Sequence, residues 1–263
     1  MIRLTFVLRR KPGMSFADFQ HYWRYQHGPL VASHATTLSI LKYIQVHSIT
    51  DPDEDQPTGP RGKMARPYDG VAELWFESLE AIKNNVNAEA GAAAAALLED
   101  ERQFIDLPHS PGWLAYDVPQ INPTPETLVA SPSLPVNKFY YVLHQKTGLD
   151  LDAAQRYWRI QHGPLVRKAG PGIGAKRYIQ VHRLQDDFND AFATSRNIVD
   201  PPYMGHAELW FDSTGIDTSG NTHPSPEAIE GGHLLYEDEA KFIDFSRSAM
   251  WFGKEHVIVD ALR

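Results

Sequence analysis

The sequence contains no cysteine, which excludes disulfide bonds, thiolate nucleophiles and cysteine metal sites. It lacks a long apolar run, so neither a signal peptide nor a membrane span is expected. The net charge is −8 and no Lys/Arg block occurs, which disfavours a nucleic-acid partner. No glycine-rich phosphate loop is present, so a nucleotide cofactor is not expected either. With no signal peptide or membrane span expected, a cytoplasmic location is the default prediction.

What the sequence does contain is a long internal repeat. The segment YWRYQHGPLV at 22–31 returns as YWRIQHGPLV at 157–166. YIQVH at 43–47 and AELWF at 72–76 return at the same offset of 135 residues. Later matches, such as EDE at 99–101, return after 138 residues. Solenoid repeats are about 20–50 residues long, so this spacing indicates a duplicated domain.

Each half shows the same order of predicted elements, β-α-β-β-α-β. Strands are expected over 2–9, 41–48, 71–77 and 113–118, and again over 138–145, 176–183, 206–212 and 250–259. Helices are expected from Ser15 to His27 and over 78–104, 150–168 and 225–242. A proline-rich segment predicts a linker. The predicted organisation is a first domain over 1–118, a linker over 119–136 and a second domain over 137–263.

This order of elements is that of the ferredoxin-like split βαβ fold, in the α+β class. Its sheet carries helices on one face, and the other face also needs a cover. Two such units commonly pack sheet to sheet and close an eight-stranded α/β barrel. One chain supplies both units here, so we expect a pseudo-dimer within the chain and leave a further homodimer open.

The alternation of the strands assigns each repeated residue to one face of the sheet. Ile44 and Val46 suit the helix-covered face, which turns their polar neighbours into the barrel. The residues predicted to point inward are Arg3, Tyr43, Gln45, His47, Glu73, Trp75, Tyr140, His144, Tyr178, Gln180, His182, His206, Glu208 and Trp210. Unpaired buried polar groups cost about 1–3 kcal/mol each. The barrel interior should therefore be either a ligand cavity or a sealed hydrogen-bonded network.

These motifs are where the chain resembles a known family. The Tyr-Trp-Arg-x-Gln-His-Gly-Pro-Leu-Val segment, followed by Tyr-Ile-Gln-Val-His, resembles the EthD family of the dimeric α/β-barrel superfamily. The resemblance covers two tandem units and leaves out the linker. It implies only a broad range of chemistry, from cofactor-free cyclases, isomerases, dehydratases, decarboxylases and monooxygenases to haem enzymes. A bacterial chalcone isomerase of similar tandem build, which uses a histidine in the same helix region, also looks related.

His27 and His162 stand where the first helix of each half is predicted to end. A histidine in a last helical turn, followed by Gly and Pro, can simply complement the helix dipole. The alternative is a general acid/base at the mouth of the cavity, because imidazole titrates near neutral pH. The resemblance favours the second interpretation.

A second candidate set combines Tyr43, His47 and Glu73 with their repeats Tyr178, His182 and Glu208. A Tyr–His–Glu relay suits proton abstraction next to a carbonyl, with the phenol stabilising the enolate. The two glutamates can equally be ion-pair partners of Arg3 and Lys138. The second half carries extra inward groups, which slightly favours its site as the more reactive one.

Substrate contacts are predicted for residues whose rings or polar groups face the expected cavity: Arg3, Tyr22, Gln45, Trp75, Tyr140, His144, Tyr157, Gln180, His206 and Trp210. The loops 48–70 and 183–205 have equal lengths and are interpreted as either lids or solvated excursions. No His-x-x-x-His spacing occurs on a predicted helix, so no metal is predicted.

The sequence therefore predicts a cofactor-independent lyase or isomerase of the dehydratase, cyclase or decarboxylase type. It would act by acid–base catalysis on a small aromatic or polyketide-like carbonyl compound. Two alternatives remain open: a non-catalytic small-molecule binding protein, and a haem-dependent barrel enzyme in which one histidine is the axial ligand.

Overall fold

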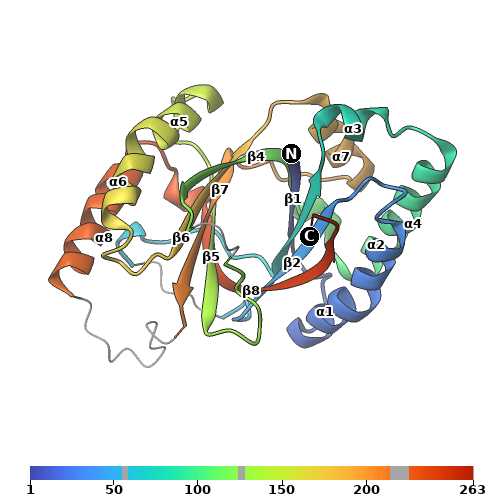
Figure 1. Cartoon of the computed structure of the whole chain (residues 1–263), viewed down its shortest axis with the longest axis horizontal. Coiled ribbons are helices and arrows are strands. Elements are labelled where there is room, and N and C mark those ends of the chain that lie inside the picture. Colours follow the sequence, from blue (N-terminus) through green and yellow to red (C-terminus); the bar gives the residue numbers. More distant parts are fainter. Residues whose placement is uncertain (55–58, 124–127, 214–224, 263) are drawn as a thin grey trace.

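The computed structural model describes residues 1–54, 59–123, 128–213 and 225–262, and in this part the strands close into one barrel (Figure 1). Every neighbouring pair of strands is antiparallel, in the order β1-β3-β2-β8-β5-β7-β6-β4. The strands are β1 (Ile2–Leu8), β2 (Lys42–Ser48), β3 (Gly70–Phe76), β4 (Gly112–Ile121), β5 (Val136–Leu143), β6 (Arg177–Arg183), β7 (Gly205–Asp212) and β8 (Ala249–Asp260). The predicted pseudo-dimeric barrel is confirmed.

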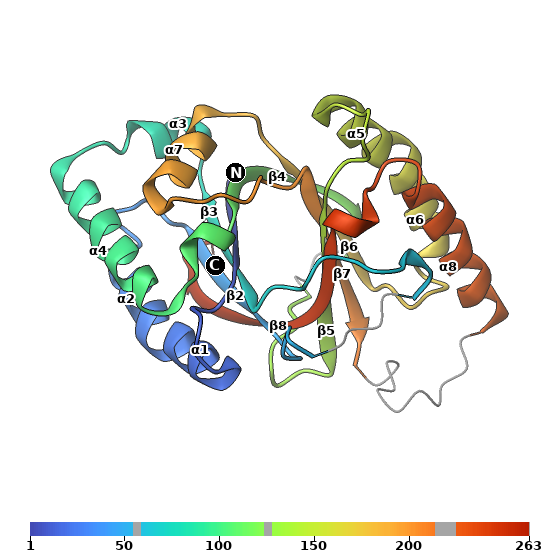
Figure 2. The same ribbon diagram turned by 180° about the vertical axis from the view of Figure 1, so that it is seen from behind.

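The helices cover the outside of the barrel on two opposite sides (Figures 1 and 2). One side carries α1 (Phe16–Tyr22), α2 (Gly28–His34), α3 (Leu79–Asn84) and α4 (Ala88–Phe104), and the other α5 (Leu151–Tyr157), α6 (Gly163–Ala169) and α8 (Pro226–Glu239). The short 3₁₀ turns are η2 (Gly59–Arg61), η3 (Leu107–His109) and η5 (Phe245–Arg247). Among the described residues, no helix is long and apolar enough to cross a membrane.

One helix lies outside its own half. Residues 184–205 were expected to form a loop, but they contain α7 (Asp187–Arg196), which begins at the cap residue Asp186. This helix belongs to the second half by sequence, yet it lies beside α3 and α4 of the first (Figure 1). The two halves therefore exchange segments as well as share a barrel.

The first helix of each half does not end at the repeated histidine, contrary to the sequence-based expectation. It passes through a π-helical turn, η1 (Trp23–His27) or η4 (Trp158–His162), and continues as α2 or α6. Gly28 keeps a right-handed helical φ of −54°, and its N–H bonds the carbonyl of Trp23. Because the π-turn shifts the hydrogen bonds by one residue, the following proline is accommodated. The helix-end interpretation of His27 and His162 is therefore wrong.

The faces predicted for β2 and β6 are reversed. Ile44 and Val46 lie in the barrel core, whereas Tyr43 packs in the layer between sheet and helices. His47 stacks on Trp23 of the covering helix at 4.3 Å between ring centroids. Both faces of this sheet are buried, so apolar alternation alone does not identify the barrel side. The same correction applies to Gln45 on β2 and to the equivalent residues of β6, all of which face the helices: Tyr178, Gln180 and His182.

The inward orientation of β1, β3, β5 and β7 is confirmed. Arg3 contacts Glu208 at 2.9 Å and Lys138 contacts Glu73 at 2.7 Å, each reaching across to the other half. Glu255 of β8 joins them at 3.2 Å from Lys138. Buried charges of this kind are stable only when paired. Of the two alternatives for the barrel interior, these contacts match the hydrogen-bonded network.

Candidate active sites between sheet and helices

Each half contains a large pocket between its sheet and its helices. The first-half pocket has a volume of about 600 Å³ and the second-half pocket about 490 Å³. Their walls are mostly apolar and are built from equivalent positions of the repeat. His27 and Tyr43 line the first pocket, and His162 and Tyr178 line the second. The cavities therefore lie outside the barrel, on the side where the helices pack.

In each half the repeated histidine is held by an aspartate of a later helix, which is α4 in the first half and α8 in the second. His27 Nδ1 lies 2.7 Å from Asp100 Oδ2, and the Tyr22 hydroxyl donates to the other carboxylate oxygen at 2.8 Å. In the second half, His162 Nδ1 lies 2.9 Å from Asp238 Oδ2. There the Tyr157 hydroxyl donates to Asp238 Oδ1 at 2.7 Å.

The electrostatics keep both aspartates ionised. Hydrogen bonds from His27 and Tyr22 lower the pKa of Asp100 below its ordinary value, although burial opposes them. Burial also acts to raise the pKa of Asp238, but hydrogen bonds from His162, Tyr157 and Lys241 hold it well below the ordinary value. A carboxylate at Nδ1 favours the tautomer with a proton on Nδ1. The Nε2 atom of each histidine is then free to accept a proton from a molecule in the pocket.

The tyrosines of β2 and β6 supply a hydrogen-bond donor to the same pockets. The Tyr178 hydroxyl oxygen accepts from Trp158 Nε1 at 2.9 Å and from Gln180 Nε2 at 3.1 Å. Tyr43 receives the equivalent pair of bonds in the first half. Because both bonds arrive at the oxygen, the phenolic hydrogen remains available for a bound ligand. Burial raises the pKa of Tyr43 and Tyr178 well above 10, so both hydroxyls stay protonated.

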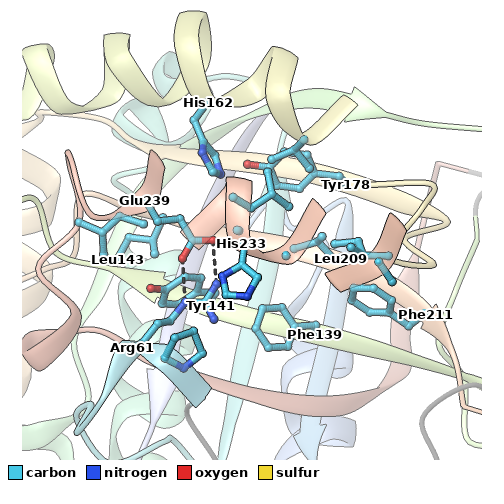
Figure 3. A pocket seen from close by; sticks show the side chains of 18 of the residues that line it. Arg61, Phe139, Tyr141, Leu143, His162, Tyr178, Leu209, Phe211, His233 and Glu239 are labelled. Carbon is cyan, nitrogen blue, oxygen red and sulfur yellow. Dashed lines mark hydrogen bonds and ion pairs between the residues drawn. The ribbon is translucent and has the colours of Figure 1, made fainter. Parts of the chain in front are cut away.

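Figure 3 shows the second-half pocket from close by. The His162 ring points from its helix toward the pocket, and Tyr178 comes from the sheet. Phe139, Leu209 and Phe211 form an apolar surface. An imidazole and a phenol at the wall of such a pocket can remove a proton and stabilise the negative charge that develops on an oxygen.

Each pocket is closed by an arginine from the other half. Arg61 donates to Glu239 through Nε at 2.7 Å and Nη2 at 2.9 Å, and Arg196 binds Glu101 in the same way at 2.8 and 2.9 Å. Arg61 and Arg196 are 135 residues apart and so are equivalent in the repeat. The loops interpreted as lids do contact the pockets, but each contacts the pocket of the opposite half. We call these two contacts the arginine straps.

Several predicted site residues support the helix rather than line a pocket. The side chain of Gln45 donates to the Trp23 carbonyl at 2.8 Å, and Gln180 donates to the Trp158 carbonyl at 2.9 Å. A Cβ at Gly28 would approach the Gln45 amide to 3.1 Å, which explains the glycine. Burial lowers the pKa of His47 to about 2 and that of His182 to about 3, so both are neutral.

The predicted Tyr–His–Glu relay is not assembled. Tyr43 and His47 face the helices, whereas Glu73 lies on the opposite face of the sheet, inside the barrel. The same holds for Tyr178, His182 and Glu208. Of the predicted site residues, those in the barrel interior are Arg3, Glu73, Tyr140, His206, Glu208 and Trp210, with Trp75 partly buried beside them. His144 packs on Tyr203 at 4.3 Å between ring centroids.

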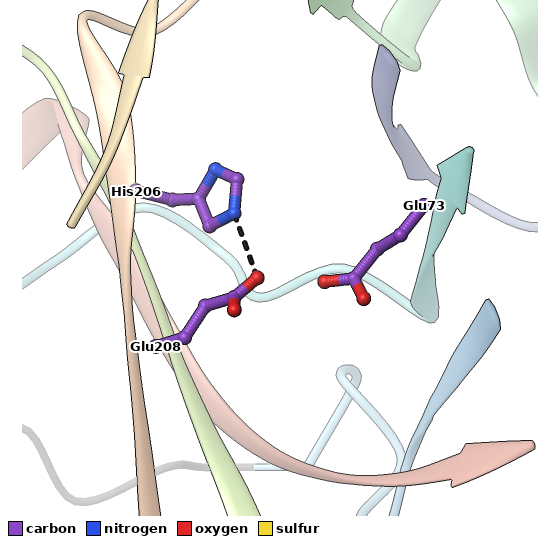
Figure 4. Close-up of side chains that lie close together, drawn as sticks. All are labelled: Glu73, His206 and Glu208. Atoms are coloured by element: carbon purple, nitrogen blue, oxygen red, sulfur yellow. Dashed lines mark hydrogen bonds and ion pairs between the residues drawn. The ribbon is translucent and has the colours of Figure 1, made fainter. Parts of the chain in front are cut away.

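Three residues inside the barrel have the composition of a metal site. One ligand atom from each of Glu73, His206 and Glu208 lies within 4.8 Å of the others (Figure 4). Arg3 and Lys138 already contact these carboxylates, however, and a divalent ion would enter beside two buried cations. Burial lowers the pKa of His206 to about 3, so its imidazole adds no further positive charge. We therefore assign this cluster to the ion-pair network.

Asp100, Asp238 and the two strap arginines were missed at the sequence level. The aspartates lie in the repeated EDE segment, so the repeat marked them without giving them a role. The arginines stand in unlike surroundings, Pro-Arg-Gly and Ser-Arg-Asn. A single matching arginine cannot be recognised as a repeat by its neighbours. It becomes visible only when the two loops are aligned by their equal lengths.

Comparison with known proteins now places the chain. The sequence profile of the EthD domain matches residues 11–108 and again 146–246. The chain belongs to the EthD domain family. Its two EthD domains are the two pocket-bearing halves described above, and no curated protein matches the sequence.

The chain is also similar to solved structures at low sequence identity. The crystal structure of an anthrone oxidase-like protein has a TM-score of 0.59 and 10% identity, and the match covers 99% of this EthD chain and 94% of that one. A dye-decolorizing peroxidase from Bacteroides thetaiotaomicron has a TM-score of 0.45 and 8% identity, with coverages of 96% and 92%. A chlorite dismutase from Candidatus Nitrospira defluvii has a TM-score of 0.43 and 11% identity, and the match covers 98% of this chain and 92% of that one. At these identities the likeness concerns the fold alone.

Proposed function

We propose that this EthD protein is a cofactor-independent acid–base enzyme of the lyase or isomerase type. It has two equivalent sites, one in each half. Its substrate is a small aromatic or polyketide-like carbonyl compound. The observation that carries the proposal is the aspartate-held histidine at the wall of an apolar pocket, present twice with nearly the same geometry.

The proposed first step is proton removal from a carbon next to the substrate carbonyl. Nε2 of His27 or His162 accepts the proton, and the aspartate at Nδ1 stabilises the imidazolium that forms. The C–H electron pair moves to the carbonyl oxygen, which becomes an enolate. The hydroxyl of Tyr43 or Tyr178 donates a hydrogen bond to that oxygen. An apolar wall strengthens these charge interactions because it excludes water.

The ring-lined pockets support the aromatic substrate class. Phe139, Phe211 and Phe252 line the second-half pocket, and Phe6, Phe76 and Phe192 line the first. Aromatic rings pack favourably against other rings in offset or edge-to-face contact. An aromatic ketone with a CH₂ group next to the carbonyl is therefore the first probe.

Deuterium exchange tests this proposal without a known substrate. The full chain is incubated in D₂O with 1-tetralone, whose C2 methylene lies next to the carbonyl, and isotope uptake at C2 is followed by mass spectrometry. We expect catalysed exchange that falls by about 10²–10⁴-fold in the double variant His27→Gln/His162→Gln. The matched control is His47→Gln/His182→Gln, which removes two neutral histidines outside the pockets and should retain exchange.

Full exchange in the His27→Gln/His162→Gln variant would contradict the proposal. Ligand binding without any exchange in the wild-type chain would point instead to a non-catalytic binding protein. In either case the aspartate-held histidines would lose their proposed role as bases.

A haem-dependent enzyme fits the pockets less well. A histidine that binds haem iron through one ring nitrogen is usually hydrogen-bonded at the other nitrogen. His27 and His162 meet this requirement, because their Nδ1 atoms contact aspartates. Haem propionates need cationic partners, however, and the arginine at each pocket is already bound to a glutamate through two hydrogen bonds. Titration with haemin should give no saturable Soret band, and stoichiometric binding would favour haem chemistry.

A further inference from the structure

One of the differences between the two pockets is a buried hydroxyl group. Tyr141 on β5 and Phe6 on β1 are equivalent in the repeat and line the second-half and first-half pockets, respectively. Both rings lie beneath an arginine strap. The Arg61 guanidinium is 5.7 Å from the Tyr141 ring centroid, and that of Arg196 is 5.5 Å from the Phe6 ring centroid. The two rings therefore share the arginine above them and differ in the hydroxyl, whereas Phe6 also packs edge-on against Phe192 at 5.1 Å between ring centroids.

The Tyr141 hydroxyl is buried and donates no hydrogen bond to a described residue, although the Arg61 guanidinium lies near enough to lower its pKa both by its charge and as a hydrogen-bond donor. Buried polar groups are normally paired, and leaving one unpaired destabilises the folded state. Phe6 shows that the fold accepts a phenyl ring at this position without that cost. A hydrogen-bond acceptor from outside the protein would take up the hydrogen that the Tyr141 hydroxyl does not donate within it.

The corner of the pocket around Tyr141 is suited to an oxygen atom. Burial and the nearby Glu239 carboxylate raise the pKa of Tyr141 well above 10, although Arg61 opposes them, so the hydroxyl remains a neutral donor. Figure 3 shows Tyr141 beside the Arg61–Glu239 pair. That pair uses Nε and Nη2 of Arg61, and its geometry is the same in the first-half pocket. The strap itself does not distinguish the two sites.

We propose that the Tyr141 hydroxyl is a recognition subsite for a phenolic or carbonyl oxygen of an aromatic ligand, present in the second-half pocket and missing from the first. The ligand oxygen reaches the hydroxyl when the Arg61 side chain, which is 20% exposed, moves aside. The inference rests on the proposed function for its ligand class, an oxygenated aromatic compound. It makes Tyr141 a specificity-determining residue rather than part of the proton-transfer set.

The test compares two probes that differ by one hydroxyl, 2-naphthol and naphthalene, titrated against the full chain by fluorescence and calorimetry. In the wild-type chain we expect 2-naphthol to bind one site more tightly than the other. Tyr141→Phe should weaken the tight site about tenfold, as expected for loss of one hydrogen bond, and change naphthalene affinity less than twofold. The matched variant Phe6→Tyr should strengthen 2-naphthol binding at the other site.

Three results would overturn the subsite. One is unchanged 2-naphthol affinity in Tyr141→Phe, as expected if only water satisfies the hydroxyl. A second is an equal loss for both probes, which would indicate a packing role. The third is failure of both probes to bind the wild-type chain. The thermal midpoint should not fall in Tyr141→Phe, because the buried hydroxyl that is removed donates no hydrogen bond within the protein. Loss of this discrimination leaves the His27/His162 exchange result untouched, so the two proposals fail separately.

Discussion

The two pockets share the groups to which we assign proton transfer, and they differ in the residues around them. Each has a histidine held by aspartate, a tyrosine donor and an arginine strap. The first pocket is covered by α7, with Phe188 and Phe192 on its wall, whereas Pro60 and Arg61 of a short 3₁₀ turn reach the second. Two matched positions also differ, with His233 and Lys241 in place of Ala95 and Gln103.

This comparison indicates which parts of the site tolerate change. In the proposed mechanism the histidine, aspartate and tyrosine act on the reacting atoms, so a small displacement of any of them would abolish the chemistry. The covers and rim residues act on the rest of the ligand. Divergence concentrated there is typical of two sites that retain one reaction and come to prefer different ligands.

The largest expected effect separates two equivalent glutamates inside the barrel. Burial and the charge of Glu208 raise the pKa of Glu73 to about 8, so Glu73 is largely protonated at neutral pH. Burial also acts to raise the pKa of Glu208, but Arg3 and Lys138 lower it well below its ordinary value. Glu208→Gln should therefore lower the free energy of unfolding by about 3 kcal/mol, and Glu73→Gln by less than about 1 kcal/mol. Urea denaturation measures both.

The pH dependence of the same pair has a definite sign. The pKa of Glu73 is higher in the folded chain than the ordinary value of 4.5, so its contribution to stability falls as the pH rises from about 4.5 to about 8. Across this range Glu73→Gln should gain stability relative to the wild type. Two results would refute the assignment of the proton to Glu73. One is an equal loss of unfolding free energy in Glu73→Gln and Glu208→Gln, and the other is a difference in unfolding free energy between Glu73→Gln and the wild type that does not change with pH.

The arginine straps should give a smaller effect that crosses between the halves. Arg196→Gln leaves the buried Glu101 without its partner and removes a guanidinium 3.9 Å from the Phe192 ring centroid. Its expected cost is about 2 kcal/mol, and that of Arg61→Gln about 1 kcal/mol because Arg61 is more exposed. Ligand titration should show that Arg61→Gln alters the second-half site. Altered binding at the first-half site instead would contradict the exchange of straps.

The smallest expected effect concerns the rim of the second pocket. Lys241 contacts Asp238 at 3.1 Å from a largely exposed position, and Gln103 replaces it in the first half. Lys241→Gln makes the two aspartate environments alike. It should change deuterium exchange at the second site by less than about twofold, because exposed ion pairs contribute little. A tenfold change would show that Lys241 takes part in proton transfer.

The repeat made the architecture predictable, because it supplied element order, pseudo-symmetry and the paired histidines together. The faces of β2 and β6 were not predictable, since Ile44 and Tyr43 both enter apolar layers. A pattern of alternation separates buried from exposed faces, and here neither face is exposed. His27 was recognised as a candidate, but its aspartate partner lies more than seventy residues away, at a distance that periodicity does not span. The helix α7 was missed because its sequence is polar and rich in aspartate.

The exchange of α7 and the 3₁₀ turn between the halves determines which pocket a substitution in either half affects. In a symmetric homodimer, a contact of this kind would be made twice by identical subunits. Fusion into one chain lets the two copies mutate independently. A substitution near residue 61 then acts on the site of the second half, and one near residue 196 acts on the site of the first. Each half therefore contributes to the specificity of the other's site.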